Sequence, residues 1–81
     1  MNRMENKADR RNLYRVLRKT GIPKRNISIN ATFNEDLHFD STDWTIFIYY
    51  LENIFKVSIR EEEIRRLNCV SDTLILLKNI A

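Results

Sequence analysis

The chain has 81 residues, of which 43% are hydrophobic and 31% charged, with one Gly, one Pro, one Cys and one His. This length predicts one small domain with a limited core, over residues 1–81, with residues 1–4 disordered. One cysteine excludes an internal disulfide, and one Cys with one His match no zinc-ligand spacing and no familiar Cys/His catalytic spacing. An enzyme is therefore the least supported class, and we expect no metal.

The apolar runs of the chain are short. None approaches the ~20 residues that a helix needs to cross a bilayer. The first residues, MNRMENKADRR, contain no apolar stretch like that of a signal peptide. We therefore expect a cytoplasmic, monomeric protein.

The charge is divided unevenly along the chain. Residues 1–27 contain nine Lys/Arg and two acidic residues, for a net charge of +7. The remaining residues contain five basic and nine acidic side chains, for −4. This division indicates two surfaces with different partners, or a self-complementary bundle.

The low Gly and Pro content and the apolar periodicity favour helices. A first helix is predicted from about Glu5 to Thr20, ended by Gly21 and Pro23. A long loop over residues 22–39 follows, held by apolar anchors. The anchors are Ile27, Ile29, Phe33 and Leu37.

A second helix is predicted to begin at the Asp40 to Asp43 segment, whose oxygen-bearing side chains are typical N-caps, and to end at about Phe55. Its core stripe is Trp44, Phe47, Ile48, Leu51 and Phe55. A short helical turn from Glu61 to Leu67 and a last helix capped by Ser71 complete the chain. In the last helix, Leu74, Leu77 and Ile80 share one side. The fold class is therefore all-α, with four helices, a long loop between the first two and a short third helix.

An ordered set of short motifs covers about two thirds of the chain. The set consists of Asn30, Ala31, Thr32, Phe33; Glu35, Asp36, Leu37; Asp40, Ser41, Asp43; Leu51, Glu52, Phe55; Ile59, Glu61, Glu62; and Val70. In this order and spacing it resembles the discrete, fatty-acid-type acyl carrier proteins. The resemblance implies a non-catalytic carrier with the four-helix acyl-carrier fold.

The resemblance also implies a modification site. Ser41 matches the serine that a separate phosphopantetheinyl transferase loads with 4'-phosphopantetheine from coenzyme A, whose thiol then carries acyl groups as thioesters. A phosphodiester there would lie at the positive end of the helix dipole. Asp40 and Asp43 either assist transferase docking or complement the dipole.

Partner enzymes of acyl-carrier-like chains dock on the second helix. Helical geometry places five residues of that helix at or near the side away from its core stripe, and we expect them to form the docking surface. They are Thr42, Ile46, Tyr49, Tyr50 and Asn53. Five further residues are expected to line an acyl pocket or to pack as ordinary core, and both roles are compatible. They are Phe47, Leu51, Ile59, Leu67 and Leu74.

The sequence departs from the family pattern in three places. Only Asp43 and Glu52 are acidic on the second helix, and Thr42 replaces the usual bulky aliphatic residue. His38 and Phe39 stand where Gly and a small or aliphatic residue are usual. Gly adopts positive φ freely and His less readily, so the sequence leaves the geometry of this turn open. The first helix is basic in a family that is generally acidic.

Two alternatives stay open. An unmodified carrier-like interaction module would use the Tyr49 and Tyr50 surface and would not need Ser41. A basic helical protein would bind nucleic acid through residues 1–25, although we rank this partner low. Its contacts would be Arg10, Arg11, Arg15 and Arg18.

Overall fold

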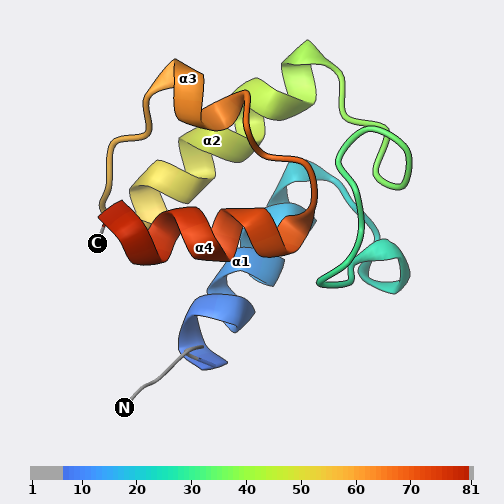
Figure 1. Cartoon of the computed structure of the whole chain (residues 1–81). Helices are drawn as coiled ribbons and strands as arrows, with labels where there is room; N and C mark the ends of the chain where they lie inside the picture. The colour runs from blue at the N-terminus through green and yellow to red at the C-terminus, as the bar shows by residue number, and fades with distance from the viewer. Residues whose placement is uncertain (1–6, 81) are drawn as a thin grey trace.

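A computed structural model describes residues 7–80 of the chain (Figure 1). The helices are α1 (Lys7–Thr20), the 3-10 turn η1 (Lys24–Asn26), α2 (Ser41–Phe55), α3 (Glu61–Ile64) and α4 (Val70–Ile80). Over these residues no strand forms, and the one bridge between extended residues joins Thr32 to Cys69. The all-α prediction of four helices with a long loop between the first two is thus confirmed, whereas Glu5 and residues 1–4 lie outside the described part.

The end of α1 is set by Gly21, whose φ of +114° is accessible to glycine and strained for other residues. The Gly21 N–H donates to the Arg18 carbonyl, and the Ile22 N–H reaches back to the Leu17 carbonyl. These two bonds are the Schellman arrangement that satisfies the last carbonyls of a helix. The predicted stop at this glycine is therefore confirmed.

The long connection between α1 and α2 is packed by its own apolar side chains. Phe33, Leu37 and Phe39 are buried, and Ile27 and Ile29 are half-buried. Three backbone bonds tie this loop to the start of α4: the Phe33 N–H donates to the Asn68 carbonyl, the Val70 N–H to the Ala31 carbonyl and the Ser71 N–H to the Ile29 carbonyl. The loop is consequently a fixed part of the core, as its apolar anchors predicted.

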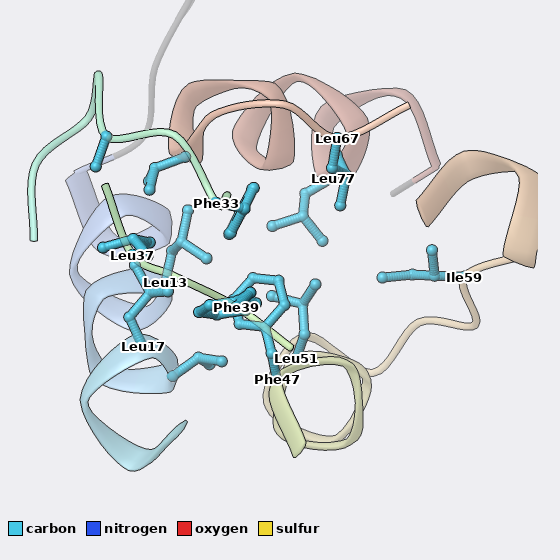
Figure 2. Packing of buried hydrophobic residues seen from close by; sticks show 13 residues of the cluster. Leu13, Leu17, Phe33, Leu37, Phe39, Phe47, Leu51, Ile59, Leu67 and Leu77 are labelled. Atoms are coloured by element: carbon cyan, nitrogen blue, oxygen red, sulfur yellow. The ribbon is translucent and has the colours of Figure 1, made fainter. Parts of the chain in front are cut away.

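The core lies between α1, α2, α4 and the long loop. In Figure 2, Leu13 and Leu17 of α1 point toward Phe39 and Phe47. On α2, only Phe47 and Leu51 are fully buried, while the other members of its predicted core stripe are half-buried. These others are Trp44, Ile48 and Phe55.

Two predicted boundaries need correction. α3 ends at Ile64 and not at Leu67, because the Arg66 and Leu67 N–H groups bond three residues back and tighten the last turn. α4 begins at Val70, so Ser71 lies inside the helix and is not its cap. The Asp72 carboxylate instead accepts the N–H groups of Asn68 and Cys69, at 2.9 and 3.1 Å.

Candidate functional site

Ser41 is the first residue of α2, and its side chain is exposed. Its carbonyl accepts a bond from Thr45 Oγ1 at 3.0 Å, as the first turn of a helix allows. Within residues 7–80 its hydroxyl has no hydrogen-bond partner. The hydroxyl is therefore accessible to a modifying enzyme at the positive end of the α2 dipole.

Asp40 and Asp43 form a reciprocal capping box around Ser41. The Asp43 N–H donates to Asp40 Oδ1 at 2.9 Å, and the Asp40 N–H donates to Asp43 Oδ2 at 3.1 Å. Two N–H groups at this end of the helix are thereby satisfied. Of the two roles predicted for these acids, the geometry supports capping directly. A role in transferase docking stays a prediction.

We expect Asp40→Ala to lower the free energy of unfolding by about 1 kcal/mol, because the N-cap acceptor is lost. Urea unfolding followed by far-UV circular dichroism measures this change. Asp40→Asn is the matched control, since its amide oxygen can still accept the Asp43 N–H. Equal losses in both variants would mean that charge, and not capping, is responsible.

The turn before Ser41, whose geometry the sequence leaves open, has a positive φ in the structure. His38 has φ of +56°, a conformation that glycine adopts without strain and histidine less readily. The next residue, Phe39, is buried and contacts the rings of Phe33, Trp44 and Phe47 at centroid distances of 5.1, 5.1 and 5.5 Å. This aromatic cluster of Phe33, Phe39, Trp44 and Phe47 packs against the first two turns of α2. Ser41 thus starts a helix whose first turns are anchored in the core.

The five predicted docking residues differ in exposure. Thr42, Tyr49 and Asn53 are exposed, whereas Ile46 and Tyr50 are half-buried. Tyr49 is 63% exposed, and its ring meets that of Tyr50 edge-on at 5.4 Å. The Lys19 ammonium of α1 lies 5.7 Å from the Tyr50 ring centroid. The surface on α2 is therefore aromatic at its centre and bordered by a cation.

Glu52, one of the two acidic residues on the second helix, is not free at the surface. Its side chain is half-buried, and Oε2 accepts the Ile59 N–H at 2.8 Å. This bond ties the end of α2 to the link that leads to α3. Its role is structural, so the acidic side chain that remains within α2 is Asp43, which belongs to the capping box with Asp40.

Four of the five predicted acyl-pocket residues are buried: Phe47, Leu51, Ile59 and Leu67. Figure 2 shows Ile59 entering this region from the link before α3, with Leu67 beside Leu77 at α4. Leu74 is half-buried, whereas Leu77 on the same helix is buried. These residues form one continuous apolar core, and a role in binding an acyl chain stays a prediction.

Two features were missed in the sequence. Thr73 is fully buried, and its hydroxyl has no hydrogen-bond partner in the described residues. The second feature is a basic groove beside α1. The i, i+4, i+7 spacing of Arg11, Arg15 and Arg18 is the sequence signal that could have revealed it. In the described part of the chain, no cluster of His, Cys, Asp or Glu has a metal-binding arrangement, and each helix is too short or too polar to span a bilayer.

The amino-acid sequence of the chain is similar to those of known proteins. No family model matches the chain. The acyl carrier protein of Chlamydia caviae is 32% identical over 63 residues, which make up 78% of this chain and 82% of the relative. The chain belongs to the acyl carrier protein family. The acyl carrier protein of Kocuria rhizophila is 30% identical over 64 residues, which cover 79% of each chain.

The fold comparison agrees with this membership. A solved structure of a proposed acyl carrier protein from Mycobacterium tuberculosis superposes with a TM-score of 0.64 at 27% identity. The superposition covers 88% of this chain and 93% of that one. The predicted resemblance to acyl carrier proteins is thereby confirmed over most of the molecule, and with it the role of an acyl carrier protein.

Proposed function

We propose that this acyl carrier protein carries acyl intermediates as thioesters on a 4'-phosphopantetheine arm attached to Ser41. The pathway class is fatty-acid-like, specialised lipid or polyketide biosynthesis. The observation that supports the proposal best is the exposed, unbonded Ser41 hydroxyl at the first position of α2. The arm, once attached, supplies a flexible thiol that keeps the acyl group tethered between encounters with different enzymes.

The residues around Ser41 fit a phosphodiester. The helix N-terminus favours negative charge there. The capping box holds both neighbouring carboxylates against backbone N–H groups at 2.9 and 3.1 Å. The chain's own part is therefore to present one hydroxyl on a rigid helix end, with catalysis left to the transferase and to the acyl-transfer or synthase enzymes.

The docking surface that we propose for these enzymes is formed by the five α2 residues named above, with Tyr49 at its centre. Tyrosine is enriched at interaction hot spots because it combines apolar area with a hydroxyl. An acidic docking face is not available here, since Glu52 is bonded to the Ile59 N–H. We infer that the partners recognise shape and aromatic rings more than negative charge.

The acyl cargo is proposed to contact the apolar core at Phe47, Leu51, Ile59, Leu67 and Leu74. Ring centroids in the aromatic cluster lie 4.7 to 5.9 Å apart, so the space next to the first turns of α2 is filled. We expect short acyl chains to be accommodated more readily than long ones. The chain is proposed to act as a single monomeric domain over residues 1–81.

The test is the intact mass of the full chain after incubation with coenzyme A, magnesium and a broad-specificity phosphopantetheinyl transferase. We expect a gain of one phosphopantetheine in the parent and none in Ser41→Ala. Thr42→Ala is the matched control, because it removes a neighbouring exposed hydroxyl and should still be modified. A folded parent chain that gains no mass while a known carrier is loaded would favour the unmodified interaction module instead.

A further inference from the structure

An open groove of about 500 Å³ lies along α1 and reaches η1 and the residue after it. Its lining residues are Arg11, Tyr14, Arg15, Arg18, Lys19, Lys24 and Ile27. Five of these seven side chains are cationic and none is acidic. The groove is therefore a concentrated positive site with a small apolar component.

The positive charge of this groove is not neutralised by the rest of the described chain. In residues 7–80, ion pairs are found at α3, where Arg60 pairs with Glu63 and Arg65 with Glu61. Among these described residues, none forms an ion pair with Arg11, Arg15, Arg18 or Lys24. Like charges crowded along one helix repel each other, so an anion in the groove would stabilise it.

The groove is continuous with the proposed docking surface on α2. Lys19 lines the groove, and its ammonium lies 5.7 Å from the centroid of the Tyr50 ring. Tyr50 in turn contacts Tyr49, which is 63% exposed. Arginine and tyrosine are the residues enriched where protein partners bind. One partner can therefore cover both surfaces.

We propose that the α1 groove binds an acidic segment of a partner protein, rich in Asp and Glu and flanked by apolar side chains. Its carboxylates pair with Arg11, Arg15 and Arg18, since the guanidinium fork matches a carboxylate in a bidentate way. Its apolar side chains contact Tyr14 and Ile27. The inference rests on the proposed carrier function in so far as this partner also docks on α2.

The dimensions favour a protein segment over a nucleic acid. Arg11 and Arg18 are seven residues apart, which at 1.5 Å per residue is roughly 10 Å along α1. The phosphates of a nucleic acid repeat at regular intervals along its backbone and extend well beyond this length. Outside residues 1–27 the chain carries a net charge of −4, which repels such an extension. A short acidic segment matches the groove without meeting that repulsion.

A membrane surface is also a poorer match. Membrane-bound basic helices insert apolar side chains next to their cations. The large aliphatic residues of α1 are Leu13, Val16 and Leu17, and all three are fully buried in the core, while Tyr14 is half-buried. This leaves the helix without an apolar face to insert, so the groove is better suited to an acidic protein segment.

The test measures fluorescence anisotropy of a labelled peptide of about 12 residues, long enough to span the groove at ~1.5 Å per helical residue, with alternating Glu and Leu. The full chain is titrated at low salt, because exposed ion pairs are screened as salt rises. We expect Arg11→Ala/Arg15→Ala to weaken binding by at least about tenfold, which corresponds to ~1.4 kcal/mol. Alanine is a strong helix former, so α1 persists in this variant.

The matched control is Arg66→Ala/Lys78→Ala, which removes the same charge from exposed positions outside the groove. Binding in this control is expected to change by less than about twofold. Equal weakening in both variants, or absence of binding by the parent, would overturn the proposal. The proposal would also be overturned if an oligothymidylate of equal charge, or phosphatidylglycerol vesicles, bound the parent more tightly than the peptide does and lost this binding in Arg11→Ala/Arg15→Ala.

The same titration with Ser41→Ala separates this inference from the proposed function. The groove lies on α1 and η1, so Ser41→Ala should bind the peptide as the parent does. A parent chain that binds the peptide but gains no phosphopantetheine would contradict the carrier proposal alone. Intact modification without peptide binding would contradict the groove proposal alone.

Discussion

Replacing Phe33 by alanine is expected to lower the free energy of unfolding by about 3 to 5 kcal/mol. Phe33 is 1% exposed, and its ring lies 4.7 to 5.4 Å from three other aromatic rings. Its backbone N–H also joins the long loop to the Asn68 carbonyl before α4. The substitution opens a cavity where the loop, α2 and the α3–α4 connection meet.

The expected loss is a large share of the total stability, which for a domain of this size is roughly 4 to 12 kcal/mol. Because Phe33→Ala could remove most of the stability, urea unfolding is measured for this variant and for the milder Phe33→Leu, which keeps most of the buried volume. The control is Tyr49→Ala, because that ring is 63% exposed and should matter little to folding. A Phe33→Ala loss no greater than that of Tyr49→Ala would contradict the central position of this ring.

Replacing Thr73 by valine is expected to raise the free energy of unfolding by about 1 to 2 kcal/mol. Thr73 is fully buried, and its hydroxyl has no hydrogen-bond partner in the described part of the chain. Burying an unpaired hydroxyl costs free energy, and valine occupies nearly the same volume without that cost. Thermal and urea unfolding both report the change.

Thr20→Val is the matched control for this prediction. The Thr20 hydroxyl is also buried, but it donates to the Val16 carbonyl at 2.8 Å. Its removal therefore loses a bond, and we expect stability to fall by about 1 kcal/mol. If Thr73→Val were destabilised to the same extent, the Thr73 hydroxyl would have to be bonded in solution.

Much of the fold follows from short-range patterns in the sequence. The apolar spacing in α1 and α2 predicts helices because residues three and four positions apart share a helical face. Asp40 and Asp43 predict the start of α2, since their carboxylates reach N–H groups only three residues away. Ser41, placed by the same local pattern and by the family resemblance, is found at the first helical position.

The tertiary structure decided what depends on contacts between distant segments. Glu52 has the spacing of an exposed helical residue, yet its carboxylate turns to the Ile59 N–H after the end of α2. Ser71 has the chemistry of an N-cap, yet the bridge between Thr32 and Cys69 and the bonds to Asp72 start α4 two residues earlier than a Ser71 cap would.

The groove beside α1 and the buried hydroxyl of Thr73 also depend on contacts between distant segments. The basic residues are evident in the sequence, but η1 must fold back to bring Lys24 and Ile27 next to α1. Thr73 is polar and would be expected at the surface, but it shares the buried face of α4 with Val70 and Leu77. Local patterns determine which elements form, whereas long-range packing decides which of their side chains are covered and which surfaces become continuous.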